Sequence, residues 1–338
     1  MLKVLAFEPA GRHEVPEDLG SLIHLKYFSF TIVSREGTVI PKSIGMLENL
    51  ETLDLTRTLI FDLPREICKL RKLRHFLGDA ISLNQLKDGI GGMASLQTLR
   101  RVYLHGNEDE YDDKVVELIE ELGKLNQLKE LDLFLYGVFK RKYMSVISSS
   151  ISKMQQMEKL YITCGVIDFH LNLPKLRYLV LDGELEKLPE WIPNLHYLVK
   201  LKLIYSKITY DTIQLLKSMP NLLSISLRKD AYVGETLHFQ NEWFKNLKEL
   251  YLHDLKNLKY IVIEQGALPS LKKLHISSDS VSAFQLKTIP TGIQHLKKLE
   301  NLSICYVSEE FRQNLSLNGG TDHWIFKQVP FVDIRPRR

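Results

Sequence analysis

The sequence predicts an α/β solenoid built from short stacked repeats, and the recurring pattern L-x-x-L-x-L carries this prediction. The pattern occurs 13 times in 338 residues, and successive copies start 19 to 29 residues apart. The composition, with 44% hydrophobic and 25% charged residues, is that of a globular protein and excludes disordered and collagen-like chains. Because a chance apolar run would not keep such a period, one repeat architecture should extend along the chain.

The copies cover the chain from its first residues almost to its end. They are LKVLAF (2–7), LKYFSF (25–30), LETLDL (50–55), LRHFLG (73–78), LRRVYL (99–104), LKELDL (128–133), MEKLYI (157–162), LRYLVL (176–181), LVKLKL (198–203), LLSISL (222–227), LKELYL (247–252), LKKLHI (271–276) and LENLSI (299–304). Repeats of about 20 to 29 residues with this spacing are leucine-rich repeats. We therefore expect a leucine-rich-repeat domain of about 13 repeats at 1–310 and a C-terminal cap and tail at 311–338.

Each copy predicts a strand and a turn. In LETLDL the alternation directs Leu53 and Leu55 inward and Asp54 outward. The preceding segment carries apolar residues three apart, as at Ile44 and Leu47, which suits a 3₁₀ turn on the other side of the repeat. One repeat cannot bury its apolar side alone, so neighbours stack and their strands pair in parallel. The expected product is a horseshoe with a concave parallel β-sheet and a 3₁₀ or helical convex side.

Three longer repeats should carry α-helices on the convex side. Apolar residues at helical spacing mark the segments 112–125, 143–154 and 209–219. Many leucine-rich repeats place Asn or Cys three residues after the last strand leucine. Here that position holds varied residues, including Thr58 and Tyr136, so we expect no continuous side-chain ladder.

Several other classes of protein find little support. No window of about 18 apolar residues occurs, so no transmembrane segment is expected, and the N-terminus has no signal core. Cys68, Cys164 and Cys305 lie far apart without a C-x-x-C pair, which favours a reducing compartment and a cytoplasmic location. Residues 1–169 carry 22 basic and 24 acidic side chains, and residues 170–338 carry 23 and 17. The excess of positive charge in the second half is too small to predict a nucleic-acid partner.

The N-terminal repeats carry a family resemblance. Residues 15–76 contain VPEDLGSLIHLKYFSF, IPKSIGMLENLETLDL and LPREICKLRKLRHF. This stretch resembles the repeat region of plant coiled-coil nucleotide-binding leucine-rich-repeat (NLR) disease-resistance proteins, whose repeats follow LPxxIxxLxxLxxLxL. SLQTLRRVYL (95–104), ELGKLNQLKELDL (121–133) and DHWIFKQVPFVDI (322–334) are similar to later parts of the same region. The resemblance covers essentially the whole chain and concerns the repeat region alone.

The resemblance implies plant defence by a non-catalytic module. In that family the repeat region recognises a pathogen effector or a guarded host protein, and it docks on a nucleotide-binding domain to hold it inactive. The phosphate-binding string G-x-x-x-x-G-K-[ST] does not occur in this sequence, so the nucleotide-binding and N-terminal signalling domains are expected to be absent from this chain. No cofactor is expected here, and ADP or ATP is implied only for the missing domain. Repeats up to about residue 100 would then dock, and later repeats would recognise the partner.

Outward strand positions supply the candidate binding residues. Tyr and Arg are rich in interface hot spots because they bury a large area while keeping a polar group, although β-propensity alone also favours Tyr there. The candidate partner-binding residues of the concave face are Tyr103, Asp132, Phe134, Tyr161, Tyr178, Lys202, Arg228, Tyr251 and His275. The candidate interdomain docking residues are Tyr27, Asp54 and His75.

Other interpretations remain open. The main alternative is a stand-alone leucine-rich-repeat adaptor that binds a protein or a small ligand, with Lys200, Lys202 and Arg228 as the basic cluster of its pocket. An enzyme is the weakest reading, because no nucleophile, base and orienting group can be placed together, and no paired His or Cys spacing indicates a metal. The acidic run at 108–113 and the basic triplet at 140–142 would form either a docking contact or solvated loops.

Overall fold

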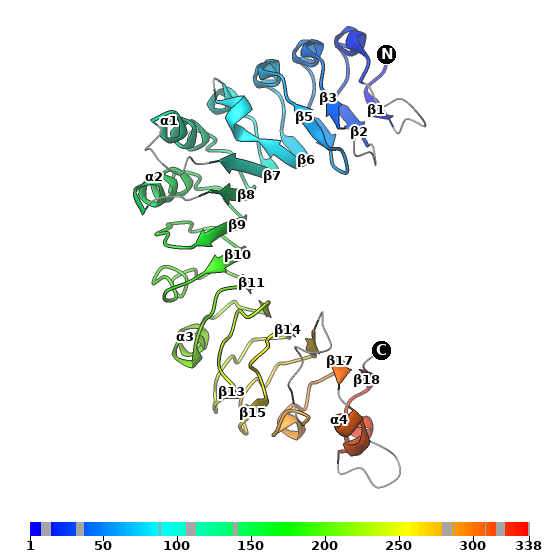
Figure 1. The fold of residues 1–338 in the computed structure, drawn as a ribbon, viewed down its shortest axis with the longest axis vertical. Helices are drawn as coiled ribbons and strands as arrows, with labels where there is room; N and C mark the ends of the chain where they lie inside the picture. The colour runs from blue at the N-terminus through cyan, green and yellow to red at the C-terminus, as the bar shows by residue number, and fades with distance from the viewer. Residues whose placement is uncertain are drawn as a thin grey trace. The chain divides into compact units, whose positions relative to one another are not determined.

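The computed structural model describes residues 1–7, 15–31, 37–87, 89–105, 113–137, 141–278, 286, 288–307, 309–315 and 322–336 (Figure 1). The chain divides into two compact units, unit 1 at Met1–Leu176 and unit 2 at Arg177–Arg338. Both units repeat the same coil, in which a strand of the main sheet alternates with a 3₁₀ turn, a helix or an extended segment.

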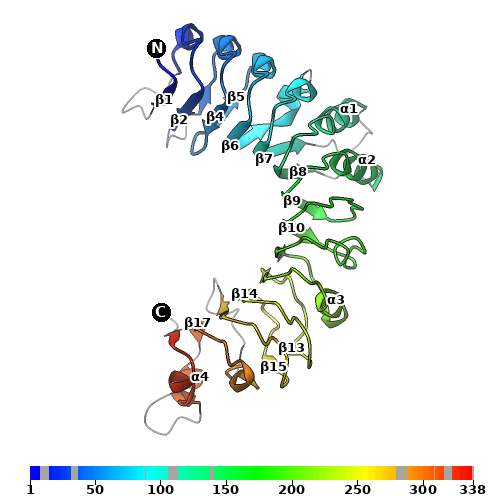
Figure 2. The ribbon, with the colours of Figure 1, turned by 180° about the vertical axis from the view of Figure 1, so that it is seen from behind.

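The main strands of unit 1 pair in parallel in chain order. They are β1 (Val4–Phe7), β2 (Tyr27–Phe30), β4 (Thr52–Leu55), β6 (His75–Ser82), β7 (Thr98–His105), β8 (Glu130–Tyr136) and β9 (Lys159–Val166). Two short strands, β3 (Thr38–Val39) and β5 (Ile60–Asp62), form a separate pair. The helical elements are η1 (Glu17–Ser21), η2 (Lys42–Met46), η3 (Arg65–Lys69), η4 (Leu83–Leu86), η5 (Ile90–Gly92), α1 (Asp113–Leu122) and α2 (Arg141–Ser152). Figures 1 and 2 show the helical elements of this unit on the side of each repeat away from the strands.

The main strands of unit 2 also pair in parallel in chain order. They are β10 (Tyr178–Glu184), β11 (Lys200–Ile204), β12 (Ser224–Arg228), β14 (Glu249–His253), β16 (Lys273–Ser277), β17 (Asn301–Val307) and β18 (Phe331–Pro336). A separate pair consists of β13 (Thr236–Phe239) and β15 (Tyr260–Ile263). The helical elements are α3 (Tyr210–Leu216), η6 (Ile293–His295), α4 (Glu309–Asn314) and α5 (Ile325–Gln328).

Rows of inward leucines form the core of both units. Leu53 and Leu131 in unit 1 have no exposed surface, and Leu201 in unit 2 is 1% exposed. Burying one such side chain contributes roughly 2 kcal/mol, so each added repeat extends a continuous apolar core. Every predicted L-x-x-L-x-L copy contributes one parallel strand. The predicted α/β leucine-rich-repeat solenoid is therefore confirmed.

The predicted helices are also present, as α1, α2 and α3. In α1 the residues Val115, Leu118, Ile119 and Leu122 are buried, which is the amphipathic pattern expected from the sequence. Within the described residues, none of the helices combines the length and the apolar character that a membrane crossing requires.

The predicted register of the copy at 99–104 is wrong. Leu99 pairs with Leu131 on β8, so it occupies the second leucine position of its repeat and not the first. The ladder then slips between Leu99 and Val102, and Arg101 adopts a positive φ of 52°. The first leucine position belongs to Leu96, which is fully buried. This slip is a β-bulge in β7. It lengthens the repeat, so the side chains after it occupy later positions than the motif predicts.

The position three residues after the last strand leucine of β4 holds a buried hydroxyl, that of Thr58. Thr58, after β4, is 1% exposed, and its Oγ1 donates to the carbonyl oxygen of Phe30 on β2 at 2.6 Å. The bond therefore joins two neighbouring repeats. Ser206, at the same position of a unit 2 repeat, donates instead to Ile204 of its own repeat at 3.1 Å.

We predict that Thr58→Val lowers the free energy of unfolding by about 1–2 kcal/mol, because the Phe30 carbonyl loses a buried donor while the volume is kept. Urea denaturation followed by circular dichroism measures the change. Thr163→Val, a half-buried threonine on β9, is the matched control and should change stability by less than about 0.5 kcal/mol. Equal losses in the two variants would contradict the assigned role of Thr58.

Candidate functional site

A cluster of stacked rings lies on β7 and β8 of unit 1, where both strands extend past the repeat motif. Tyr103 pairs across the strands with Phe134, and His105 pairs with Tyr136. The ring centroid of Tyr103 lies 4.8 Å from that of Phe134 and 5.3 Å from that of Tyr136. The ring of His105 stacks on that of Tyr136, with centroids 5.7 Å apart. These four residues are called the aromatic cluster below. Tyr136 is 47% exposed, so the cluster offers ordered ring surface to solvent.

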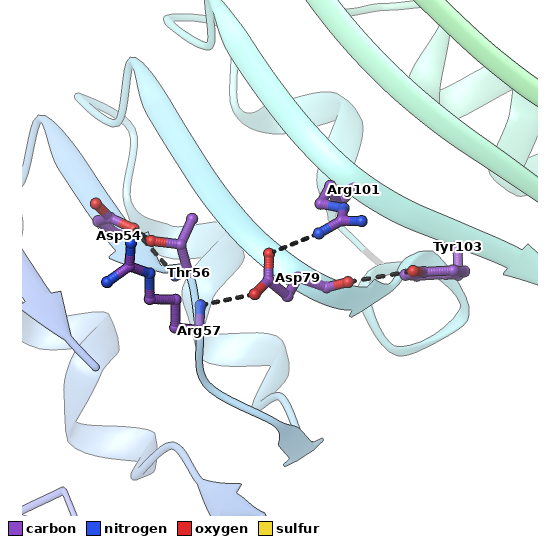
Figure 3. Close-up of polar contacts among 6 residues, drawn as sticks. All are labelled: Asp54, Thr56, Arg57, Asp79, Arg101 and Tyr103. Atoms are coloured by element: carbon purple, nitrogen blue, oxygen red, sulfur yellow. Dashed lines mark hydrogen bonds and ion pairs between the residues drawn. The ribbon is translucent and has the colours of Figure 1, made fainter. Parts of the chain in front are cut away.

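Asp79 on β6 contacts Tyr103, one member of the aromatic cluster, and Figure 3 shows the contacts of Asp79. Its carboxylate accepts the backbone N–H of Arg57 at 2.7 Å and the guanidinium of Arg101 at 3.1 Å. Its backbone carbonyl accepts the Tyr103 hydroxyl at 3.2 Å. Arg57 and Arg101 have positive φ angles of 61° and 52°, which residues other than glycine rarely adopt. Asp79 therefore stabilises two strained backbone positions and orients Tyr103.

Two carboxylates of β8 lie next to the cluster in sequence and have different surroundings. The Glu130 side chain is 10% exposed and forms ion pairs with Arg100 at 2.5 Å and Lys159 at 3.4 Å. Burial raises the pKa of Asp132 to about 6, and the charge of Glu130 adds to the rise, although Arg101 and Arg100 oppose it. Asp132 is thus a poorly solvated carboxylate, and a donor from a partner would stabilise it.

The predicted docking residues lie on three neighbouring strands of unit 1. Tyr27 is on β2, Asp54 on β4 and His75 on β6, and all three are half-buried. The Asp54 carboxylate accepts the backbone N–H and the hydroxyl of Thr56 at 3.0 and 2.7 Å (Figure 3). His75 Nδ1 lies 3.0 Å from the hydroxyl of Thr98. The structure brings the three residues onto one sheet face, and their docking role stays a prediction.

The predicted partner-binding residues divide between the two units. Tyr103, Asp132, Phe134 and Tyr161 lie on β7, β8 and β9 of unit 1, and Asp132 pairs across the strands with Tyr161. Those of unit 2 occupy five successive main strands and are Tyr178, Lys202, Arg228, Tyr251 and His275. Each set shares one sheet face within its own unit.

The far strands of unit 2 carry a linked pair of histidines. The Ser277 hydroxyl lies 2.7 Å from Nδ1 of His253 and 3.0 Å from Nε2 of His275. Burial lowers the pKa of His275, and the neighbouring His253 lowers it further. Tyr251 lies beside His275, with ring centroids 6.1 Å apart. Burial and His253 thus both favour the uncharged imidazole of His275, which adds polar surface to this face.

Several residues of these sites were missed from the sequence. They are Asp79, His105 and Tyr136 in unit 1 and His253 in unit 2. The alternation of LDLFLY at 131–136 continues past the motif, and that signal could have placed Tyr136 on the sheet face. The bonds of Asp79 could not be found this way, because its partners belong to other repeats.

Two sequence features fall largely outside the described residues. Of the acidic run at 108–113, only Asp113 is described, and it begins α1. Of the basic triplet at 140–142, the structure describes the backbone of the last two residues, within α2.

Parallel strands, inward leucine rows and half-buried aromatic side chains define this chain as a repeat solenoid with a surface suited to binding. Residues 1–315 match the family described as "Leucine-rich repeat region", and the chain belongs to this family. A leucine-rich-repeat region is a non-catalytic module, so this membership confirms the prediction that the chain is not an enzyme.

Plant disease-resistance proteins are among the chain's relatives. It is 26% identical over 323 residues to "Putative disease resistance protein At1g59780" of Arabidopsis thaliana, covering 94% of this chain and 33% of the relative. It is 29% identical over 222 residues to "Disease resistance protein RPM1" of the same plant, covering 64% of this chain and 23% of the relative. The chain thus spans about a third or less of these relatives' length, and its resemblance to the repeat region of NLR proteins is confirmed.

Among solved structures, a leucine-rich-repeat protein of Leptospira interrogans, LIC12759, is similar in chain path. The match has a TM-score of 0.41 and 20% sequence identity, and it covers 98% of this chain and 83% of that chain.

Asp132→Asn should stabilise the chain at neutral pH. The folded-state pKa of about 6 lies above the ordinary 3.8, so the folded state binds more protons than the unfolded state between these values. Stability contributed by the protonated form is therefore lost as pH rises through that window. Because the carboxyl keeps partial contact with water, we expect a gain of about 1 kcal/mol for the variant and not the full value of the shift.

Urea denaturation at pH 7 and near pH 4 measures this effect. Asp132→Asn should raise the free energy of unfolding at pH 7 and leave it nearly unchanged near pH 4. Near pH 4 the Asp132 carboxyl is protonated in the folded chain, so replacing it removes no buried charge. Glu120→Gln on the exposed face of α1 is the control and should show no pH-dependent difference. A gain that persists unchanged at low pH would contradict the assignment.

Proposed function

We propose that this chain is the recognition and autoinhibition region of an intracellular, cytoplasmic plant immune receptor. Its sheet face binds a pathogen effector or a guarded host protein, and its first repeats dock on a nucleotide-binding domain outside this chain. The similarity to disease-resistance proteins over 94% of the chain is the observation that supports this proposal most strongly. The half-buried aromatic and charged side chains of the sheet face support a protein partner.

The aromatic cluster is the proposed centre of partner contact in unit 1. Tyr103 and Phe134 are already stacked at 4.8 Å, and Tyr103 is held by its bond to Asp79, so binding orders little that is not ordered already. Asp132, two residues before Phe134, offers a poorly solvated carboxylate to a donor of the partner. Such an arrangement combines contact area with one charge-dependent bond, which is the usual composition of a hot spot.

Autoinhibition follows if the nucleotide-binding domain and the recognised protein partner bind preferentially to different states of the receptor. Docking through Tyr27, Asp54 and His75 holds the nucleotide-binding domain closed, and partner binding stabilises an arrangement in which that contact is broken. The shift requires differential affinity, and moving a population from about 1% to about 99% open requires about 5.5 kcal/mol. An extended protein interface supplies an energy of that order.

The docking surface is tested in a full-length relative in which this chain replaces the receptor's own repeat region. Expressed in leaf tissue, the chimera should be silent without a trigger, and Tyr27→Ala/His75→Ala should cause cell death without a trigger because the inhibitory contact is lost. His196→Ala/Tyr197→Ala removes the same residue types from an exposed turn of unit 2 and should remain silent. A silent Y27A/H75A receptor that still responds to its trigger would contradict docking at this face.

The recognition surface is tested in the same receptor with its trigger present. Tyr103→Ala/Phe134→Ala should weaken partner binding by roughly 10-fold or more, because two central aromatic contacts are removed. Binding is measured by interferometry on the purified receptor, and the cell-death response provides the biological readout. Tyr197→Ala, at a side chain that is 65% exposed, is the control and should bind as the unmodified receptor does. Unchanged binding by Y103A/F134A would place recognition elsewhere.

A further inference from the structure

Two half-buried cations on the sheet face of unit 2 have no carboxylate partner in the described part of the chain. Elsewhere in this unit, Lys273 pairs with Glu249 at 3.3 Å and Lys207 pairs with Glu184 at 2.9 Å, in each case across neighbouring repeats. Lys202 on β11 and Arg228 on β12 are half-buried, and among the described residues no carboxylate lies within ion-pair distance of either. A half-buried cation without a partner is costly, and an incoming anion removes that cost.

The sheet register fixes the spacing of these two cations. Lys202 pairs across the strands with Ser226, and Arg228 pairs with Ile204, two residues further along. One strand spacing and two residues of rise separate their Cα atoms by about 8 Å on the same face. In an extended peptide, side chains two residues apart point the same way at about 7 Å. Two acidic side chains in that relation therefore match Lys202 and Arg228.

The surroundings of the pair suit a polypeptide. Ser226 lies between the cations and offers a hydroxyl, and Tyr251 follows Ser226 on the next main strand. Lys229 adds a third cation, held 5.3 Å above the Tyr205 ring. Burial lowers the pKa of Lys202, and Arg228 and Lys229 lower it further, so positive charge is crowded here.

The positively charged surface around Lys202 and Arg228 spans two main strands, and the strands on either side carry acidic residues. On β10, Asp182 precedes the cations and acts on Lys202 from beyond ion-pair distance, and on β14 Glu249 follows them. A nucleic acid binds through a long row of cations that track its phosphates, and such a row is not what these strands present. The short spacing favours two discrete carboxylates.

We propose that the sheet face of unit 2 around Lys202 and Arg228 binds an acidic, extended segment of a protein partner, through Asp or Glu side chains two residues apart. This assignment deepens the proposed recognition function and rests on it for its biological meaning. Its chemistry is independent of immune signalling, and peptide binding to the purified chain tests it without a receptor response.

The experiment measures fluorescence anisotropy of labelled peptides with the purified chain at low ionic strength. The probe is a Gly/Ser peptide carrying two Glu-Ser-Glu units, and the control peptide carries Gln in place of Glu. Lys202→Met/Arg228→Met keeps the aliphatic volume and removes both charges, and its circular dichroism melt establishes that it folds. Lys297→Met/Lys298→Met removes the same charge from an exposed turn of unit 2 and is the matched control.

The unmodified chain and K297M/K298M should bind the Glu peptide, and the folded K202M/R228M variant should bind it at least about 10-fold more weakly. The Gln peptide should not bind. The assignment is overturned if the Glu peptide does not bind at millimolar concentration, if all three proteins bind it equally, or if a phosphoserine peptide or an oligonucleotide binds much more tightly. If the Glu peptide does not bind but Y103A/F134A weakens partner binding in the receptor, only the assignment of Lys202 and Arg228 is overturned. If the Glu peptide binds as expected but the receptor variants behave like the unmodified receptor, the proposed receptor function is overturned.

Discussion

Packing of leucines between successive repeats is the constraint on which the other features of this chain depend. A single repeat covers one side of its strand, and its neighbour completes the burial, so no repeat is stable alone. Because Leu53 and Leu131 are fully buried, a slip of one residue in the pairing would turn an entire row toward solvent. The register is therefore fixed, and outward side chains are held in rows about 4.8 Å apart. The binding surface follows from the core.

In unit 1, the outward side chains form a distinct cluster at the repeat whose strand departs from the regular pattern. The bulge before Val102 extends β7 and brings Tyr103 beside Phe134, so an irregular repeat creates the aromatic cluster. Asp79 then holds the strained turn at Arg101 and the Tyr103 ring together. In unit 2 the strands β10, β11 and β12 pair in regular register, and the character of their face comes from charge. Among the described residues, no carboxylate lies within ion-pair distance of Lys202 or Arg228. Each unit thus offers a different contact chemistry on the same scaffold.

The sequence predicted the parts of the structure that depend on local periodicity. The strands, the inward leucines and the three helices follow from spacing alone, because burial selects the same positions in every repeat. The predicted register of β7 was wrong because the complete motif in LQTLRRVYL starts at Leu99, whereas a start at Leu96 places Arg101 at the last leucine position. Only the pairing with β8 reveals that the repeat starts at Leu96 and carries a bulge. The Asp79 bonds and the raised pKa of Asp132 arise between repeats, so no pattern within one repeat reveals them.

The central claim is that partners meet the sheet face rather than the helical side of the repeats. Hydroxyl-radical footprinting of a full-length receptor carrying this chain, with and without its partner, tests that claim directly because it reports side-chain exposure. The account predicts that oxidation of Tyr103, Phe134 and Tyr136 falls on partner binding, while Tyr197, which is 65% exposed, stays as reactive as before. Protection confined to the helical elements, with the aromatic cluster unchanged, would contradict the account.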